Sequence, residues 1–286
     1  MTRFERSVWR RAWFHLAALC VAFVFAAPAF WVIMASLRPP GAPPSSAFDW
    51  LPESFEWSNY LRLFDLLPLE RYLLNSMIVA ALAVPLTVIV ASWAGFAIAQ
   101  LPEGMRNALI VCAIIVRMTP ITALWLPRFL VLNELRLIDT YAALLTPVWM
   151  GSSPLFVLIF YWSFRRVPTE VIESARLDGL GALSVWSRIA MPLARPATGA
   201  VSVLTFVQYW SDFINPLLYL KSESRYTLPV GLRILQQMDI TNWSLLMAGA
   251  TIMTAPIIVL FIVAQRAFWA EEQGWSARRL GMKDER

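Results

Sequence analysis

Long apolar segments separated by short polar ones run through the whole chain. A helix needs about 20 mostly apolar residues to cross the ~30 Å hydrocarbon core of a membrane. Six segments of the 286-residue chain reach this length: roughly 16–36, 73–100, 107–127, 140–162, 197–220 and 245–268. Strands of a membrane barrel are only about 10 residues long and alternate in polarity, so these runs predict helices. The pattern thus predicts an all-α membrane protein with six transmembrane helices.

Several of these segments contain prolines or runs of small residues. Five prolines lie at predicted membrane depth, where each removes a backbone hydrogen bond and tends to kink its helix: Pro85, Pro120, Pro127, Pro147 and Pro154. The second segment also carries a run of small residues: Ala91, Ser92, Ala94, Gly95, Ala97 and Ala99. Small residues let helices approach closely. The pattern is equally typical of static bundle packing and of an interface that moves.

The basic residues give an orientation. Cytoplasmic loops of membrane proteins are enriched in Lys and Arg. With the first residue inside and six spans, the inside pieces are 1–15, 101–106, 163–196 and 269–286. Together with Arg266 they hold 15 of the 24 basic residues. Both termini are therefore expected in the cytoplasm, and the net charge of +5 reflects topology and not nucleic-acid binding.

The expected organisation is a single membrane domain. It comprises a cytoplasmic N-terminal segment (1–15), a six-span domain (16–270) with a polar cytoplasmic loop at 165–195, and a charged cytoplasmic tail (271–286). The first apolar run exceeds the usual ~7–15 residues of a signal peptide, which favours an uncleaved anchor over a cleaved leader. Cys20 and Cys112 lie inside spans, so we interpret them as packing residues that form neither a disulfide nor a metal site.

Several kinds of catalytic chemistry lack the residues they need. A phosphate-binding loop has the form G-x-x-x-x-G-K-[ST], and neither Lys221 nor Lys283 stands in such a sequence. His15 is the only histidine, so no zinc site and no His-based catalytic site can be assembled. The sequence therefore predicts no metal site, no cofactor and no enzyme activity in this chain.

The polar loop at residues 168–192, hereafter the motif loop, has an internal organisation. Pro168 and Thr169 are typical of a helix start, with the Thr169 hydroxyl expected to cap a free N–H. Gly179 interrupts this helix, and a second stretch at about 183–190 is expected to end at Pro192. An apolar stripe recurs at helical spacing: Ile172, Ala175, Gly179, Leu183 and Trp186. Such a stripe fits a groove on a cytoplasmic partner or the lipid surface, and periodicity alone favours the lipid surface.

The motif loop also follows a known spacing, E-A-A-x3-G-x9-I-x-L-P. Five of the seven fixed positions are identical: Glu173, Ala175, Gly179, Ile189 and Pro192. Ser174 and Met191 are conservative departures, and Asp178 supplies an acid before the glycine. The loop thus resembles the cytoplasmic loop of ABC-importer permeases through which a separate ATPase moves the membrane pathway. The resemblance implies an ATPase-coupling role for these residues: Glu173, Ser174, Ala175, Asp178, Gly179, Ile189 and Pro192.

Further short motifs along the chain resemble the carbohydrate-importer permeases of the maltose-permease G type. They are Asn75-Ser76, Arg117-Met118 with Pro120, 137–141 (LIDTY), Trp210 with Phe213 and Pro216-Leu217, 227–232 (TLPVGL) and Gln265-Arg266. The resemblance implies a MetI-like permease fold in a bacterial inner membrane. It also implies a second homologous permease, two ATPases that bind ATP-Mg, and an extracytoplasmic solute-binding protein. A sugar or sugar derivative is the implied cargo, with glycerol phosphates and polyols open. The charged tail departs from the family pattern.

Polar residues in the predicted spans are candidates for the solute pathway. A charge at the membrane centre costs at least ~2.5–3.5 kcal/mol, so it usually faces the bundle interior or water. The candidates are Arg117, Gln208, Trp210, Asp212 and Asn215. Arg117 equally suits a clamp between helices, and the resemblance allows the partner permease to hold the sugar. Two rival functions remain, a self-sufficient secondary carrier and a membrane enzyme acting on a lipid-linked substrate.

Overall fold

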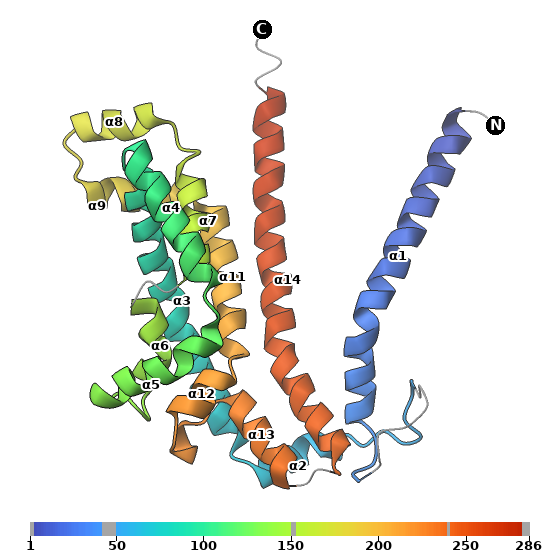
Figure 1. Cartoon of the computed structure of the whole chain (residues 1–286). Helices are drawn as coiled ribbons and strands as arrows, with labels where there is room; N and C mark the ends of the chain where they lie inside the picture. The colour runs from blue at the N-terminus through green and yellow to red at the C-terminus, as the bar shows by residue number, and fades with distance from the viewer. Residues whose placement is uncertain (1–2, 42–49, 150–152, 239–240, 282–286) are drawn as a thin grey trace. The chain divides into compact units, whose positions relative to one another are not determined.

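The computed structural model describes residues 3–41, 50–149, 153–238 and 241–281 (Figure 1). These residues form helices and no strand, which confirms the all-α prediction. The α-helices are α1 (Arg3–Ser36), α2 (Ser58–Leu66), α3 (Leu69–Ala99), α4 (Glu103–Met118), α5 (Trp125–Glu134), α6 (Tyr141–Trp149), α7 (Pro154–Phe164), α8 (Thr169–Leu177), α9 (Ala182–Val185), α10 (Met191–Leu193), α11 (Arg195–Trp210), α12 (Ile214–Tyr219), α13 (Leu228–Met238) and α14 (Trp243–Gly281). Three shorter elements complete the described fold: the 3-10 turns η1 (Ile121–Leu124) and η3 (Glu223–Arg225), and the π-helix η2 (Trp186–Ala190).

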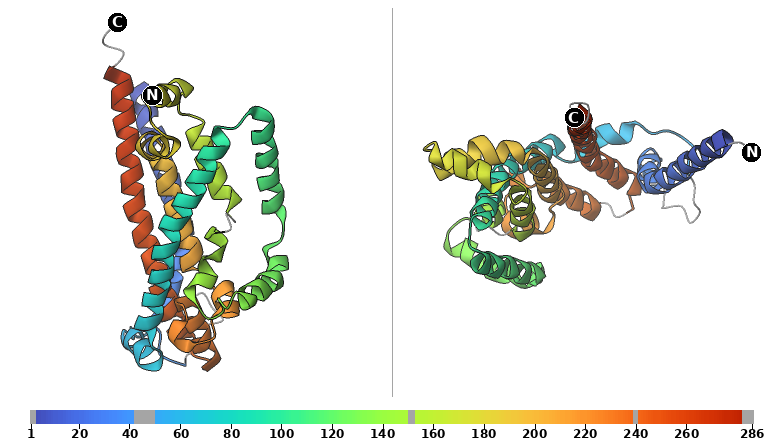
Figure 2. Two further views of the ribbon diagram at one scale, coloured as in Figure 1. Left: turned by 90° about the vertical axis from the view of Figure 1, so that its left-hand side faces the viewer. Right: turned by 90° about the horizontal axis from the view of Figure 1, so that it is seen from above.

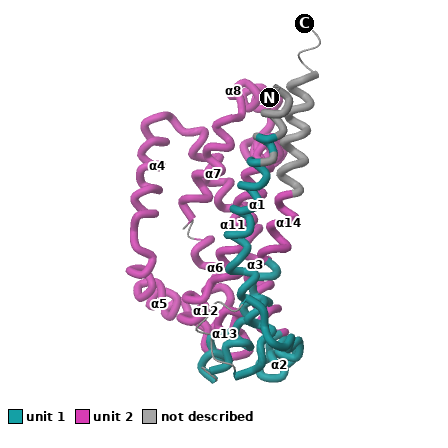
Figure 3. Tube along the Cα trace, turned by 90° about the vertical axis from the view of Figure 1, so that its right-hand side faces the viewer, with its two compact units in different colours: residues 1–69, 231–256 teal, residues 70–230, 257–286 magenta. Residues whose placement is uncertain are grey.

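The chain divides into two compact units (Figure 3). Unit 1 comprises Met1–Leu69 and Gly231–Pro256, and unit 2 comprises Glu70–Val230 and Ile257–Arg286. Within unit 1, the buried Asn59 amide donates to the carbonyls of Ser36 (2.9 Å) and Arg38 (2.8 Å). Because carbonyls at a helix end lack partners in the helix, these bonds stabilise the C-terminus of α1.

Three of the six predicted spans are continuous helices. Apolar stretches long enough to cross a membrane occur at Trp13–Ser36, Leu69–Ala99 and Trp243–Gln265. With a rise of 1.5 Å per residue, the 31 residues of α3 extend about 46 Å. The expected domain boundaries at residues 15 and 270 fall inside the continuous helices α1 and α14. The free cysteines Cys20 and Cys112 have exposed side chains, so neither packs in the interior of this chain.

The third predicted span, 107–127, is not one helix. The first helix of this span, α4, ends at Met118, Thr119 is extended, and the segment from Ile121 to Glu134 turns by 88° (Figure 2). Pro120 accounts for the break, because a proline drives the residue before it out of the helical conformation. Pro120 is one of the prolines expected to kink a helix, and the bend here is large enough to divide the span into a bent pair.

The fourth and fifth predicted spans are also divided. Helices α6 and α7 meet at 44°, with residues 150–152 outside the described part of the chain. Helix α11 stops at Trp210 and α12 starts at Ile214, so polar backbone lies between them inside the predicted span. The third bent pair joins Ala182–Leu193 to Arg195–Trp210 at 84°, and up to six spans result if each bent pair counts as one.

Close packing of α3 against α7 forms the centre of unit 2. A Cβ atom added at Gly95 would lie 2.8 Å from the Tyr161 nitrogen and 2.8 Å from the Val157 oxygen, so only glycine fits there. Ala91 and Ser92 are buried one turn earlier. Phe96 and Phe164 meet edge to face, with ring centroids 5.6 Å apart. The small residues of α3 thus serve as a packing surface.

Candidate functional site

The motif loop occupies one end of unit 2, where α8 and α9 lie beyond the ends of α3 and α7 (Figure 1). Helix α8 begins at Thr169 with Pro168 as its N-cap residue, and no side chain caps it. The expected cap by the Thr169 hydroxyl is therefore wrong. Glu170 in the first turn provides favourable charge at the positive end of the helix dipole instead.

The end of α8 explains the glycine of the motif. Gly179 has φ = +84°, a left-handed conformation that glycine adopts without a Cβ penalty. Its N–H bonds to the Arg176 carbonyl, and the Leu180 N–H bonds to the Ala175 carbonyl, both at 3.0 Å. This pair of bonds is the Schellman arrangement that terminates helices. No described atom lies within 4 Å of a Cβ placed on Gly179, so the glycine also leaves open space at the surface.

The inner face of the motif loop packs on its own chain. Ile172 and Ala175 are buried, and they belong to one apolar cluster with Phe160 of α7 and Phe96 of α3. The expectation that Ala175 faces a partner is not met, because its methyl group lies inside unit 2. The first part of the predicted stripe, Ile172 and Ala175, is thus an intramolecular contact that anchors α8 to the bundle, whereas Gly179 and Leu183 are exposed.

The outer face of the motif loop is open to a partner. Its exposed side chains include four of the predicted coupling residues: Glu173, Ser174, Asp178 and Pro192. Leu177, 89% exposed, stands directly before the turn at Gly179. Leu183 is 62% exposed on the following stretch. A helix fixed on its inner side therefore presents leucines, charges and an uncovered glycine on its outer side.

The second half of the motif loop contains a π-helix. The Met191 N–H bonds to the Trp186 carbonyl five residues back, and the helical stretch continues to Leu193. The predicted end at Pro192 is therefore wrong, and the chain breaks at Ala194, where it turns by 84° into α11. Trp186 meets Trp93 of α3 edge to face at 5.5 Å. Single π-turns are frequent at functional sites.

A polar pocket of about 90 Å³ lies deeper in unit 2. Its polar lining consists of Thr87, Arg128, Ser153, Gln208, Tyr209, Asp212 and Asn215. Three predicted pathway residues, Gln208, Asp212 and Asn215, thus come together because α11 ends at Trp210 and exposes the following turn. The Asn215 side chain donates to Asp212 Oδ2 at 2.8 Å, and its backbone N–H donates to Asp212 Oδ1 at 3.2 Å.

The other two predicted pathway residues lie elsewhere. Trp210 is 1% exposed and stacks on Phe206 with ring centroids 5.4 Å apart. Arg117 is exposed near the end of α4 and does not line the pocket. Sequence reasoning missed Arg128 and Thr87, which do line it. Arg128 follows the third predicted span, in a piece expected on the outside, and the turn after Pro120 brings it to the pocket.

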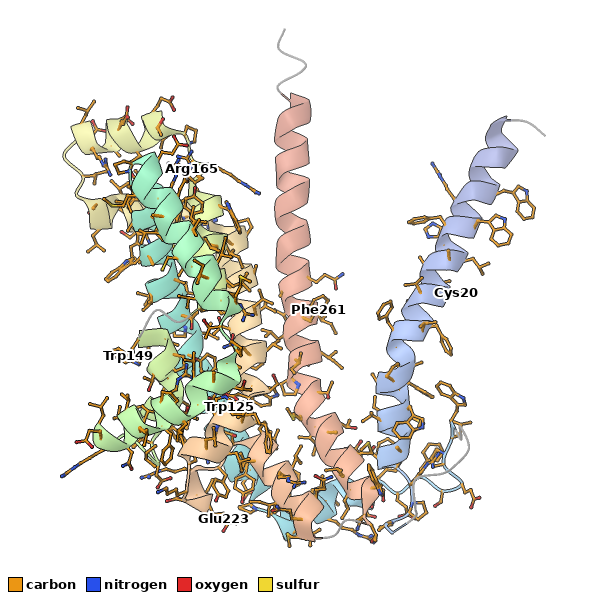
Figure 4. The ribbon with its side chains drawn as sticks, viewed as in Figure 1. Cys20, Trp125, Trp149, Arg165, Glu223 and Phe261 are labelled. Carbon is orange, nitrogen blue, oxygen red and sulfur yellow. The ribbon has the colours of Figure 1, made fainter. Side chains whose placement is uncertain are left out.

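A polar clamp closes the opposite end of unit 2, where Figure 4 labels Glu223 far from Arg165 at the motif-loop end. We define the clamp as Asp139 with Lys221, Ser222 and Arg225. The Asp139 carboxylate accepts the backbone N–H groups of Lys221 and Ser222, each at 3.0 Å, and the Ser222 hydroxyl. Arg225 contacts Asp139 Oδ2 at 2.7 Å. Burial alone would raise the pKa of Asp139, but these hydrogen bonds and Arg225 hold that pKa well below its usual value.

Motif residues of α3 secure the same segment. The Asn75 amide donates to the carbonyls of Ser224 (3.0 Å) and Tyr226 (2.9 Å). The Ser76 hydroxyl accepts the Leu228 N–H at 2.8 Å. Three sequence motifs that are far apart in the chain, around Asn75, Asp139 and Leu228, therefore meet in one hydrogen-bonded cluster.

Comparison with known proteins settles the family. The family of binding-protein-dependent transport system inner membrane components matches residues 88–270, which include the motif loop, the clamp and the lining of the polar pocket except Thr87. The chain belongs to this family. The permease is accordingly a membrane component of an ABC import system in the inner membrane, and not an enzyme.

Individual relatives agree with this assignment. The arabinooligosaccharides transport system permease protein AraQ of Halalkalibacterium halodurans is 30% identical, over 87% of this permease and 90% of the relative. The sulfoquinovosyl glycerol transport system permease protein SmoH of Agrobacterium fabrum is 27% identical, over 83% and 84%. A solved bacterial ABC transporter involved in alginate import has the same fold, with a TM-score of 0.69 at 20% identity, over 94% of this permease and 99% of that chain.

Proposed function

We propose that the permease couples a separate ATPase to solute import through the motif loop. The observation that carries the proposal is the two-sided construction of α8. Its inner residues, Ile172 and Ala175, are buried in unit 2, while Glu173, Asp178 and Gly179 face outward. A partner that pushes on the outer face would therefore move α8 together with α3 and α7. The coupling residues are Glu173, Ser174, Ala175, Asp178, Gly179, Ile189 and Pro192.

The proposed complex contains a second homologous permease, two ATPases that bind ATP-Mg, and a solute-binding protein outside the membrane. The size of the polar pocket supports the need for a second permease. Its volume of about 90 Å³ is below the ~300–1,000 Å³ typical of enclosed ligand sites. One chain alone thus supplies part of a pathway that a partner would complete.

The proposed cargo is a sugar or a sugar derivative. Relatives that align with most of this permease are named for arabinooligosaccharides and for sulfoquinovosyl glycerol. Gln208, Asp212 and Asn215 provide donors and acceptors of the kind that hydroxyl groups need. Trp210 and Arg117 would join the pathway only in another conformation, since neither lines the pocket here.

The proposed orientation places both termini and the motif loop in the cytoplasm. It rests on the distribution of Lys and Arg, with 15 of the 24 basic residues in the pieces assigned to the inside. The polar clamp, at the other end of unit 2, would then lie on the outer side, which the solute-binding protein approaches.

Mass spectrometry of a tagged, mildly solubilised copy from native membranes tests the proposal. We expect an ATPase and a second permease to co-purify with the chain. A solute-binding protein recovered with them can be denatured, and its released cargo identified. Recovery of the chain alone in several detergents, together with transport driven by an ion gradient, would contradict the proposal and favour a secondary carrier.

A further inference from the structure

Arg128 introduces a positive charge into the polar pocket. It stands in the first half of α5, directly after Pro127, and its side chain is half-buried. Apart from Asp212, the other side chains that line the pocket are apolar or neutral. A half-buried arginine in a membrane protein costs free energy unless partners or ligands compensate it, so its presence here calls for an explanation.

Asp212 does not neutralise Arg128 by contact. Both oxygens of Asp212 already accept hydrogen bonds from Asn215. Across the described residues, the ion pair within 4 Å is Arg225 with Asp139 at 2.7 Å, and Arg128 takes no part in it. Arg128 interacts electrostatically with Asp212 and Tyr209, and it is placed to donate a hydrogen bond to the Tyr219 hydroxyl. A guanidinium carries five N–H donors, so it retains capacity for a ligand.

The pocket also contains polar atoms that lack a partner. Thr87 Oγ1 and Asn215 Oδ1 are buried and have no hydrogen-bond partner in the described structure. Thr87 and Asn215 are among the residues that line the pocket together with Arg128. Buried polar atoms of this kind usually find water or a ligand, because leaving them unpaired is unfavourable. Thr87 and Asn215 can accept hydrogen bonds from hydroxyl groups, while Arg128 can donate to an anion.

We propose that Arg128 makes this permease selective for sugar derivatives that carry an anionic group. The guanidinium fork matches the geometry of carboxylates and phosphates, and sulfonates offer equivalent oxygens. Thr87 and Asn215 hold hydroxyl groups beside that anion. The inference rests on the proposed sugar cargo and adds that this sugar carries a negative charge. The competing explanation is a structural one, in which Arg128 only fixes α5 against Tyr219 and Asp212.

The test uses the complete importer in cells, supplied with two matched probes. One probe is a mixture of oligosaccharides released from an acidic polysaccharide, and the other is the same mixture after chemical reduction of its carboxyl groups. A phosphorylated sugar forms a third arm, which separates carboxylate from phosphate recognition. Because the solute-binding protein is the same in every strain, differences between permease variants report the permease itself.

The variants are Arg128→Leu, Arg128→Gln and Arg128→Lys. Arg136→Asn is the matched control, because it removes a charge just beyond α5 at φ = +54°, a conformation that asparagine tolerates. We expect wild type to import an anionic probe in preference to its reduced counterpart. Arg128→Leu should lower that preference by about tenfold, as expected when a hydrogen bond between charged groups is lost. Arg128→Lys should restore part of it, and the control should keep it.

Each outcome decides the proposal. Loss of the preference in Arg128→Leu, or in Arg128→Gln if the leucine variant fails to assemble, supports it. A wild-type preference for the reduced probe, or a preference that survives both substitutions, overturns the role of Arg128 and leaves the sugar cargo intact. Uptake of no sugar probe by a complex that assembles with its ATPase overturns the proposed cargo, and the role of Arg128 with it.

Discussion

The motif loop and the polar clamp occupy opposite ends of unit 2, and they differ in how far their groups are satisfied by contacts within the chain. The carboxylate at the centre of the clamp finds all these partners within the chain: Asp139 accepts two backbone N–H groups and the Ser222 hydroxyl and also contacts Arg225. The motif loop leaves its outer side open, with Leu177 exposed and no described atom near a Cβ at Gly179. One end is therefore closed by contacts within the chain, and the other leaves a surface that a partner can cover.

This difference suggests how the permease transmits movement. A closed hydrogen-bond network resists rearrangement, because breaking it leaves polar groups unpaired. An exposed helix that is fixed on one face transfers a push to the elements behind it. The clamp would serve as the fixed end and the motif loop as the driven end, with the pocket between them. Substitutions at the two ends should accordingly fail in different ways, at the clamp through stability and at the motif loop through coupling.

The largest expected effect belongs to Gly179→Asp. The new side chain meets no described atom of the permease, but it stands on a left-handed backbone with φ = +84° that favours glycine. A block is therefore assigned to a partner that packs against the glycine only where the variant inserts with the thermal stability of wild type. We expect uptake to fall by roughly tenfold or more, corresponding to about 1.4 kcal/mol or more of lost docking energy. Uptake of the cargo, and the amount of ATPase that co-purifies, measure the effect.

Gly181→Asp controls for the added carboxylate, and the thermal stability of Gly179→Asp controls for its backbone strain. Gly181 lies two residues away, is exposed, and has φ = −70° in the N-cap position of α9, where aspartate is favourable. It should insert, assemble and transport like wild type. Normal uptake by Gly179→Asp, or equal loss in both variants, would count against close docking at Gly179.

Sequence reasoning recovered the driven end better than the fixed end. The spacing from Glu173 to Pro192 located the motif loop, because a motif of fixed residue spacing can be recognised from the sequence alone. The inward orientation of Ala175 did not follow from it, since a periodic stripe does not say which surface it meets. Whether that surface is lipid, partner or the chain's own bundle depends on tertiary packing against α7.

The fixed end and the pocket depended on long-range contacts that no local pattern reveals. Proline illustrates the limit. Pro85 lies inside the continuous helix α3, whereas Pro120 ends a helix and turns the chain by 88°. Both read as breakers in sequence, and neighbouring helices decide the outcome. That turn brings Arg128 into the pocket, which is why the sequence placed this residue in an outside loop.

The second prediction tests the clamp through Asp139→Asn. Asparagine tolerates the left-handed backbone at this position, where φ is +62°, but it loses the charge that Arg225 contacts. We expect a loss of about 1–2 kcal/mol and a thermal midpoint a few degrees lower in the detergent-purified importer. Lys221→Gln is the control, because Lys221 contributes only its backbone N–H to Asp139. An unchanged midpoint in Asp139→Asn would show that the clamp is not the fixed end.

The third prediction concerns pH. The pKa of Asp139 is lowered in the folded state by the bonds from Ser222 and Lys221 and by Arg225, against the effect of burial. A lowered pKa contributes stability above the unfolded value of about 4, and this contribution is lost as the pH falls through the folded pKa. The midpoint difference between wild type and Asp139→Asn should thus be constant from pH 8 to 5 and shrink below about pH 4. A difference that grows on acidification would contradict the assignment.

The smallest expected effect concerns the contact between Arg176 of α8 and Gln100, which tests whether Arg176 belongs to the inner or the outer face of α8. Arg176 donates to Gln100 Oε1 of its own chain at 3.0 Å, but both side chains are exposed. Exposed polar pairs contribute little, so a double-mutant cycle of Arg176→Gln and Gln100→Ala should give a coupling free energy of at most ~0.5 kcal/mol. Uptake should change less than about twofold, because this contact lies within the permease. A much larger loss of uptake at unchanged stability would move Arg176 to the partner-facing side, and the driven surface of the motif loop would then extend across α8 to the end of α3.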